Sequence, residues 1–244
     1  MFSRAIQLNP RYADAFYNLG NTWQRLREYG KATASYRQAL QFNPQDYEAW
    51  TNLGATNKEL NQVEEAVAVL DRALQIQPEF ALAHWNRAIV LLLAGRLPEG
   101  FQEYEWRWRM GGPIFAPRKF TQPLWNGEAI REKTLFVHAE QGFGDAIQFM
   151  RYVRLARQCA ARVVLECPPP LQSLFEEAGC AAAVIALGQN PPPFDCYVPL
   201  MSLPRLFQTT LETIPNDVPY LVAPACQHLP EPFAGHLKAG LAWA

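Results

Sequence analysis

Apolar residues in the first 110 positions recur with the spacing of amphipathic helices, and small residues and prolines return at a fixed period. The positions that repeat every 34 residues are Pro10, Pro44 and Pro78; Ala5, Ala39 and Ala73; and Asn18, Asn52 and Asn86. This period is typical of stacked helical hairpins, in which each repeat buries its apolar face against the next. We therefore predict a helical solenoid over residues 1–110.

The first full repeat carries the residues on which a family resemblance rests. Residues 13–20 (Ala-Asp-Ala-Phe-Tyr-Asn-Leu-Gly), followed by Ala32, Tyr36, Ala39 and Pro44, resemble the tetratricopeptide pattern at nearly every diagnostic position. The glycine that ends this segment and Ala32 allow two helices to cross closely. Pro44 follows the second helix because proline cannot continue it.

The period also predicts where each repeat begins and ends. The repeats are expected at 13–46, 47–80 and 81–110, after a partial repeat at 1–12. The last one departs from the pattern, with Gly100 where alanine is expected and Arg107 at the position of two earlier alanines. A terminal repeat of this kind caps an array or docks on a neighbour. Because the first residues resemble the tail of an earlier repeat, we expect a chain that is truncated at its start.

Asn18, Asn52 and Asn86 occupy one position on the first helix of each repeat, which lines the inner face of such arrays. A carboxamide both donates and accepts, so a ladder of them can hold an extended peptide backbone. The arrangement resembles the asparagine ladder of O-GlcNAc transferase arrays and implies a protein or peptide partner. The alternative is that asparagine is merely common at this position, and both interpretations stay open.

The second part of the chain has a different composition. Only 4 of the 20 prolines precede residue 111, whereas all five cysteines follow it at irregular spacing, which favours free thiols in a reducing compartment. The 22 basic and 23 acidic residues form no basic field, which argues against a nucleic-acid partner. The longest apolar run, residues 88–94, is too short to span a membrane. We expect a cytoplasmic protein.

A linker at 111–132, anchored by residues 123–127, leads into alternating strands and helices. Strands are expected at 134–138, 162–166, 183–187 and about 195–199, and helices at 145–158, 171–178 and 201–207. This alternation predicts a parallel sheet covered on both faces, with a ligand crevice at the carboxyl ends of its strands.

The stretch from residue 136 to residue 150 reads as a strand, a turn at Gly142 and Gly144, and the start of a helix. Two glycines let the backbone pass close to a ligand, and a helix start favours an anionic or polar group. Asp145 and Gln148 are spaced as a capping box, so Asp145 can be the residue that caps this helix.

Several segments of the second part, in order, carry another resemblance. They are 137–149, 162–166, 193–195, 199–204, 209–215, 218–221 and 238–243. With the repeats, they resemble bacterial tetratricopeptide proteins that carry a glycosyltransferase-like module related to heptosyltransferases, over essentially the whole chain. Those relatives have the GT-B architecture of two Rossmann-like halves with the active cleft between them.

This resemblance implies a fold class of α plus α/β. Residues 133–236 would be the Rossmann-like N-terminal half, which handles a sugar acceptor, and residues 237–244 the first strand of a missing C-terminal half. The nucleotide-sugar donor would bind that missing half, so no cofactor is expected in this chain. We expect a fragment, truncated at both ends, that is inactive alone.

The resemblance also implies roles for single residues. Asp145 would be the general base for the acceptor hydroxyl, a role that requires hydrogen-bond reach and that is compatible with capping the helix. The candidates for substrate binding beside it are His138, Glu140, Gln141, Gly142 and Gly144.

Other chemistries fit less well. Ile147 stands where a dinucleotide fingerprint needs a third glycine, and no acidic ribose ligand follows the second strand unless Glu166 is counted. No metal-ligand pattern appears. The main interpretation is a glycosyltransferase-like fragment with a peptide-binding tetratricopeptide arm. The alternative is a non-catalytic scaffold for protein–protein interaction.

Overall fold

The computed structural model describes residues 2–112 and 116–221 of the chain. The chain divides into two compact units, Met1–Pro117 and Arg118–Ala244. The strand expected at 237–244, the last residues of the domain expected at 133–236, and Cys226 lie outside the described residues.

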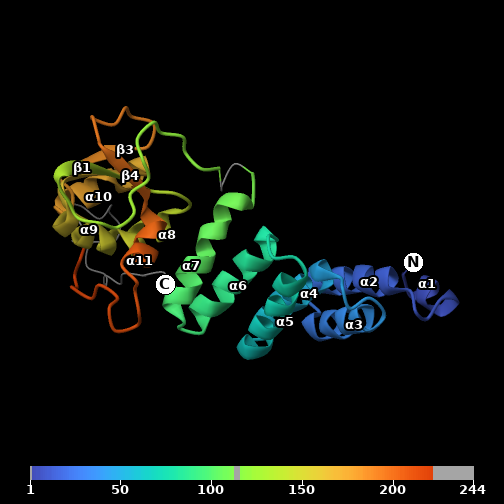
Figure 1. The fold of residues 1–244 in the computed structure, drawn as a ribbon. Coiled ribbons are helices and arrows are strands. Elements are labelled where there is room, and N and C mark those ends of the chain that lie inside the picture. Colours follow the sequence, from blue (N-terminus) through green and yellow to red (C-terminus); the bar gives the residue numbers. More distant parts are fainter. Residues whose placement is uncertain (1, 113–115, 222–244) are drawn as a thin grey trace, which may run out of the picture. The chain divides into compact units, whose positions relative to one another are not determined.

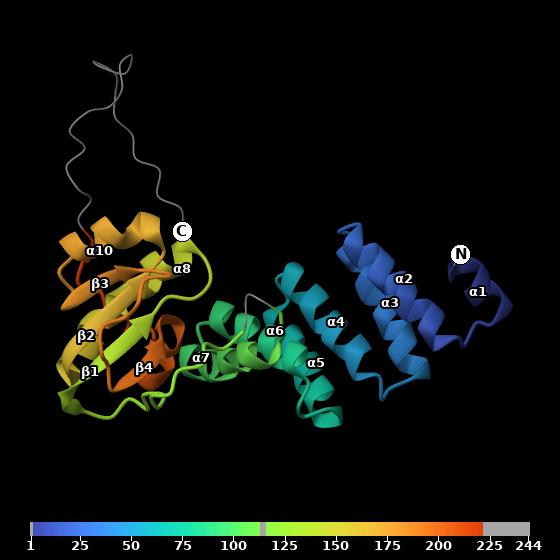
Figure 2. The same cartoon turned by 90° about the horizontal axis from the view of Figure 1, so that it is seen from above.

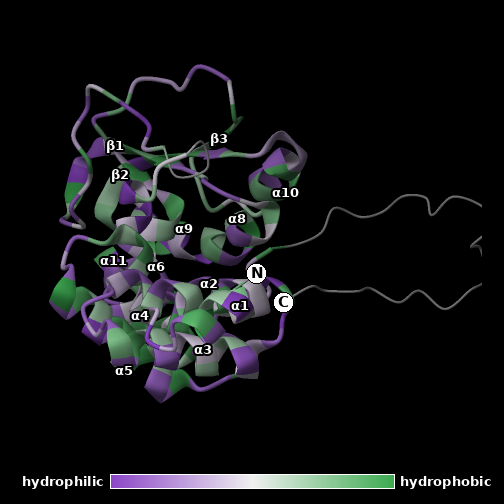
Figure 3. Cartoon of the chain, turned by 90° about the vertical axis from the view of Figure 1, so that its right-hand side faces the viewer, coloured by the Kyte–Doolittle hydropathy of each residue, from purple (hydrophilic) through white to green (hydrophobic). Residues whose placement is uncertain are grey.

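The first unit is built from helices that pair as hairpins. They are α1 (Phe2–Leu8), α2 (Ala13–Arg25), α3 (Tyr29–Phe42), α4 (Tyr47–Glu59), α5 (Val63–Ile76), α6 (Ala81–Leu93) and α7 (Leu97–Tyr104), followed by the 3-10 helix η1 (Glu105–Arg109). Helix α2 lies beside α3, α4 beside α5, and α6 beside α7 (Figure 1). Hydrophobic and hydrophilic segments alternate along these helices, as expected for helices that bury one face (Figure 3).

The first two hairpins cross at glycines, as predicted. A Cβ added at Gly20 would lie 2.6 Å from Cε1 of Tyr36, and one added at Gly54 would lie 2.5 Å from Cγ of Leu70. Tyr36 and Leu70 are fully buried. Only a residue without a side chain fits between these helices, so the small residue of the pattern sets the distance between them.

The departure of the third repeat has a structural reason. Ala88 occupies the position of the two crossing glycines, and the close approach moves to the second helix. A Cβ added at Gly100 would lie 3.0 Å from the backbone nitrogen of Leu92. The chain then tightens into η1, where the buried Arg107 donates to the carbonyl of Tyr104 at 3.2 Å.

The second unit contains a four-stranded parallel sheet. Its strands are β1 (Ile130–His138), β2 (Ala160–Cys167), β3 (Ala183–Ala186) and β4 (Cys196–Pro199), in the order β3-β2-β1-β4. All four were predicted within a few residues. Because β1 lies between β2 and β4, the strand order reverses beside the carboxyl end of β1.

The connections of this unit are short helices. They are α8 (Phe143–Phe149), η2 (Met150–Tyr152), α9 (Val153–Cys159), η3 (Pro169–Leu171), α10 (Gln172–Glu177), η4 (Leu200–Ser202) and α11 (Leu203–Leu206). The helix predicted at 145–158 is therefore divided into α8, η2 and α9. Helices α8 and α10 lie along one face of the sheet (Figure 2).

The other face of the sheet carries a cluster of aromatic rings. The ring of Phe136 on β1 lies 5.6 Å from that of Phe120 and 4.9 Å from that of Phe194. Residues 123–125 extend the sheet next to β4, because Trp125 N–H donates to the carbonyl of Tyr197 at 2.7 Å. Trp125 is itself buried, as expected of an anchor for the segment before β1.

Candidate functional site

The predicted asparagine ladder lies on α2, α4 and α6, the first helices of the three hairpins. Asn18, Asn52 and Asn86 are all half-buried. The side-chain N–H of Asn18 donates to the carbonyl of Asp14 on the same helix at 2.8 Å. Asn86 makes no side-chain hydrogen bond with any residue that the structure describes. The free polar groups of the ladder are therefore its side-chain oxygens, one N–H group of Asn18 and the whole amide of Asn86.

Asn52 joins a polar network that the sequence pattern did not reveal. Its side-chain N–H group donates to Oδ1 of Asn21 at 3.1 Å and to the hydroxyl of Tyr17 at 3.2 Å. The hydroxyl of Tyr36 donates to the same Asn21 oxygen at 2.7 Å, and Oε1 of Gln24 lies 3.0 Å from that hydroxyl. Burial raises the pKa of Tyr36 and of Tyr17, so both hydroxyls keep their protons at neutral pH.

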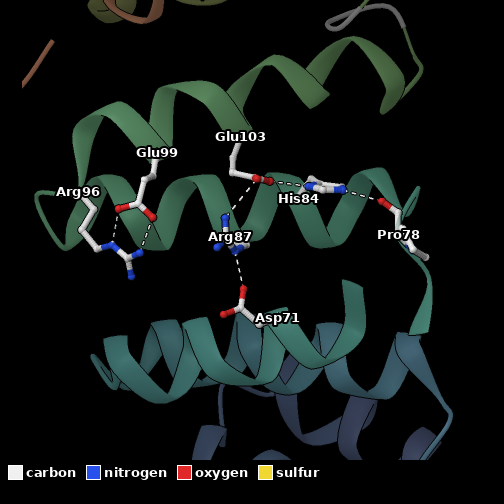
Figure 4. Close-up of polar contacts among 7 residues, drawn as sticks. All are labelled: Asp71, Pro78, His84, Arg87, Arg96, Glu99 and Glu103. Atoms are coloured by element: carbon white, nitrogen blue, oxygen red, sulfur yellow. Dashed lines mark hydrogen bonds and ion pairs between the residues drawn. The ribbon is translucent and has the colours of Figure 1, made fainter. Parts of the chain in front are cut away.

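A network of polar contacts links helices α5, α6 and α7 (Figure 4). Arg87 on α6 donates to Asp71 on α5 at 2.6 Å and pairs with Glu103 on α7 at 3.1 Å. His84 lies between Glu103 at 2.5 Å and the carbonyl of Pro78 at 2.8 Å. Both of its ring nitrogens lie within hydrogen-bond distance of acceptors, which fixes the orientation of the ring. This network holds the third hairpin against the second, so its role is structural.

In the second unit, the loop after β1 begins beside the neighbouring strands. His138 pairs in register with Glu166 of β2 and with Pro199 of β4. Its side chain is 2 % exposed and lies on the aromatic face of the sheet, 6.0 Å from the ring of Phe120. His138 is the last residue of the strand, so its side chain does not lie with the other substrate-binding candidates on the loop that follows.

The backbone of this loop also turns at a different residue from the one predicted. The left-handed residue is Gln141, at φ 66°, whereas Gly142 has φ −85° and Gly144 lies inside the first turn of α8. A Cβ added at Gly144 would meet nothing within 4 Å. Neither glycine therefore forms the turn. Because they have no side chains, they leave the N-terminus of α8 uncovered.

Asp145 contributes to the start of α8 from its third position. Its Oδ2 accepts from the backbone N–H of Gly142 at 3.2 Å, and Gly142 is the N-cap. The expected capping box of Asp145 with Gln148 is wrong, because the helix begins at Phe143, earlier than predicted. Asp145 therefore fills the anion-favouring end of this short helix with its own carboxylate.

Glu140 ties two loops of the carboxyl edge together. Its Oε1 accepts from the backbone N–H of Met201, which follows β4, at 3.2 Å. Glu140 and Gln141 on the loop and Asp145 in the first turn of α8 are partly exposed. The structure thus brings together five of the six predicted site residues of this unit, and it separates only His138 from them.

The structure also contains an ion pair between Arg118 and Glu166 that was not predicted from the sequence. Glu166 at the end of β2 has a side chain that is 1 % exposed, and its Oε2 pairs with the guanidinium of Arg118. Burial raises the pKa of this carboxyl group, and Arg118 partly opposes that shift. The two residues lie 48 positions apart, so no local pattern could reveal their contact.

The described ranges, 2–112 and 116–221, contain no group of three or more histidine, cysteine, aspartate or glutamate side chains that could hold a metal ion. Nor does any described helix have the length and apolar character needed to cross a membrane.

Comparison with known proteins bears on the first unit. Family models of the tetratricopeptide repeat match residues 13–46, 35–68 and 57–95. Protein FlbA of Caulobacter vibrioides is 39% identical over 75 residues, which are 29% of this chain and 12% of FlbA. This chain therefore spans only a small part of the length of that relative.

Solved structures give partial likenesses. A crystal structure of MamA shares 19% identity with a TM-score of 0.43, over 45% of this chain and 64% of that one. The TPR domain of Arabidopsis OM64 shares 20% identity with a TM-score of 0.37, over 37% and 75%. The first TPR of Spaghetti (RPAP3), bound to the HSP90 peptide SRMEEVD, shares 18% with a TM-score of 0.40, over 44% and 82%. The family models carry the assignment: residues 13–95 of this chain are tetratricopeptide repeats.

Proposed function

We propose that the first unit is a protein-interaction module that binds an extended peptide segment along α2, α4 and α6. The observation that carries this proposal is the ladder of Asn18, Asn52 and Asn86, which repeats one polar group at one position of each first helix. An extended peptide presents N–H and C=O groups at regular intervals, and a carboxamide can pair with either. Recognition of this kind uses the ligand backbone and therefore tolerates many ligand sequences.

The hydrogen bonds within the ladder define what the ligand must supply. Asn52 uses both of its side-chain N–H groups on the protein itself, so it presents only an oxygen to the ligand. Asn18 uses one of its two N–H groups, so it presents an oxygen and one N–H group. The ligand then donates a backbone N–H group at the second repeat, whereas Asn18 and Asn86 can both accept and donate.

The test uses peptides selected on the chain from a random phage-displayed library, with affinities measured by isothermal titration calorimetry. The double variant Asn18→Ala/Asn86→Ala removes two of the three asparagine side chains of the ladder and leaves the hydrogen bonds of Asn52 intact. We expect about 5- to 30-fold weaker binding, because two hydrogen bonds contribute roughly 1 kcal/mol each. Unfolding in urea should be unchanged.

A matched control removes two exposed carboxamides from second helices, in Gln38→Ala/Gln102→Ala. These residues lie on α3 and α7, away from the ladder, and their loss should leave the affinity unchanged. If no peptide is enriched, or if both double variants weaken binding equally, the ladder is not a peptide-binding site.

A second candidate function concerns the second unit, as the acceptor side of a glycosyl-transfer site. The observation that favours it is the position of loop 139–142 and Asp145 at the carboxyl end of β1, beside the reversal of strand order, where parallel sheets bind ligands. Asp145 would be the general base. Its bond to Gly142 uses Oδ2, so the other carboxylate oxygen could face an acceptor hydroxyl.

Transfer is tested with a panel of labelled nucleotide sugars and monosaccharide acceptors on this chain fused to a donor-binding half, because the chain alone is expected to be inactive. We expect Asp145→Asn to lower transfer by about 10²- to 10⁴-fold, as loss of a general base does, while the amide oxygen keeps the bond to Gly142. Asp217→Asn, at an exposed aspartate, is the matched control. Absence of transfer from every donor, or equal activity in Asp145→Asn, would reject the catalytic proposal and leave the interaction module.

A further inference from the structure

We propose that a cavity at the amino ends of β2 and β3 binds a phosphate group, free or carried by a small molecule, through Arg154 and Arg157. Helix α9 and the turn after α10 form this cavity, and they lead into the first residues of β2 and β3. The cavity therefore lies at the opposite edge of the sheet from loop 139–142. The proposal depends neither on peptide recognition by the first unit nor on sugar transfer.

The cavity is large enough for a small organic molecule. Its volume is about 450 Å³, and cavities that bind such ligands have volumes of about 300–1,000 Å³. Its lining consists of Arg154, Arg157 and Gln158 from α9, and of Ala178, Gly179 and Cys180 from the turn. The space therefore accommodates a phosphate group together with a group that carries it.

Arg157 is held in place by the protein itself. Its guanidinium donates to the carbonyl of Gly179 at 2.8 Å. Arg157 also lies in the last turn of α9, where the helix dipole favours a cation. Arginine has five N–H groups, so this one bond leaves further donors available to a ligand. The contact with Gly179 thus fixes one guanidinium at the cavity.

Arg154 has a charge that the described chain does not balance. It is half-buried one turn before Arg157, and it makes no hydrogen bond or ion pair with any residue that the structure describes. Asp217 lines a smaller cavity beside Arg154 but forms no ion pair with it. The described lining of the larger cavity contains no carboxylate. Two like charges therefore share this cavity, and a bound anion would relieve their repulsion.

The number of charges favours phosphate over a carboxylate. Burial raises the pKa of the Cys180 thiol to about 11, whereas the charges of Arg154 and Arg157 act in the opposite direction. Both guanidinium groups thus act on the same thiol, which stays neutral and supplies no counter-charge. A phosphate monoester carries about 1.5 to 2 negative charges at neutral pH and three acceptor oxygens, which matches two arginines. A carboxylate balances only one of them.

The test is an NMR titration of the isotope-labelled full chain at constant ionic strength, followed through the amide signals of residues 178–180. The probes are inorganic phosphate, phenyl phosphate and acetate. We expect saturable shifts with both phosphate compounds and no saturable shift with acetate. Arg154→Gln should weaken phosphate binding about 10- to 100-fold, because it removes one charged hydrogen-bonding group.

Arg154→Gln replaces a side chain without a partner, so its circular dichroism and its unfolding in urea should match those of the wild type. Arg154→Lys is a second variant. It keeps the charge but loses the planar fork of donors, and it should retain part of the affinity. Arg131→Gln, at an exposed arginine outside the cavity lining, is the matched control and should bind phosphate as the wild type does.

Tighter binding of phenyl phosphate than of inorganic phosphate identifies a phosphorylated organic molecule as the ligand, and equal affinity identifies phosphate itself. Either result supports the site. Three results would overturn it: no saturable shift with either phosphate compound, acetate binding as strong as phosphate binding, or equal weakening in Arg154→Gln and Arg131→Gln. Any of them would show that the two arginines form only a solvated helix surface.

Discussion

Gly20→Ala should destabilise the first unit by about 1 kcal/mol, whereas the same substitution at Gly30 should stabilise it. The new methyl carbon at Gly20 would lie 2.6 Å from the ring of Tyr36. That ring is fully buried, and its hydroxyl is held by Asn21. Overpacking of a rigid core costs about 1–3 kcal/mol, which exceeds the roughly 1 kcal/mol gained when alanine replaces glycine in a helix.

Gly30 is the matched control because a Cβ there would meet nothing within 4 Å. Alanine at this position should add about 0.5 kcal/mol through its lower backbone entropy in the unfolded chain. Hydrogen exchange of the amides in α2 and α3, followed by mass spectrometry, reports on this hairpin separately from the second unit. Changes of the same sign at both glycines would show that the helix crossing does not depend on the missing side chain.

The repeats could be predicted because each hairpin needs the same small residues and helix-ending prolines at the same spacing. The turn inside each hairpin shows the limit of this reasoning. Arg27, Asn61 and Gly95 are also 34 positions apart, and all three have left-handed backbones, with φ of 59°, 57° and 74°. The residue types differ, so the shared conformation was not visible in the sequence. It follows from the packing of the two helices.

The parallel strands could be predicted from short apolar runs. The loop after β1 could be predicted as a candidate site because it follows the carboxyl end of a strand. The contacts that shape this loop could not. Glu140 reaches Met201, 61 residues later, and Arg118 reaches Glu166, 48 residues later. Such pairs depend on how the strands are ordered in the sheet. Local composition placed the turn at a glycine, whereas the structure has Gln141 in the left-handed conformation.

Arg118→Ala should destabilise the second unit by about 2–3 kcal/mol at pH 8. The substitution leaves the carboxylate of Glu166 buried without its charge partner, and breaking a buried pair in this way costs about 3–5 kcal/mol. The loss is smaller here because the Arg118 side chain is 34% exposed and its charge is already partly hydrated. Arg131→Ala, at an exposed arginine of β1, is the matched control and should change stability by less than about 0.5 kcal/mol.

The loss of stability in Arg118→Ala should also depend on pH. The direction of this dependence follows from the raised pKa of Glu166. Burial already raises the pKa of this carboxyl group in the folded chain, and loss of Arg118 raises it further. An unfolded glutamate titrates near about 4.3, so the folded variant binds a proton at pH values where the unfolded chain has lost it. Stability therefore falls as pH rises from about 4.3 through the raised folded pKa, and the deficit shrinks again at low pH.

Hydrogen exchange of the β2 amides at pH 5 and pH 8, corrected for the intrinsic exchange rate, measures this difference. Two variants identify the cause. Arg118→Lys keeps a positive charge and should recover much of the stability, and Arg118→Ala/Glu166→Gln removes the buried charge and should lose the pH dependence. A deficit that is equal at both pH values, or that persists unchanged in the double variant, would show that Arg118 acts through packing on Phe120 instead of through its charge.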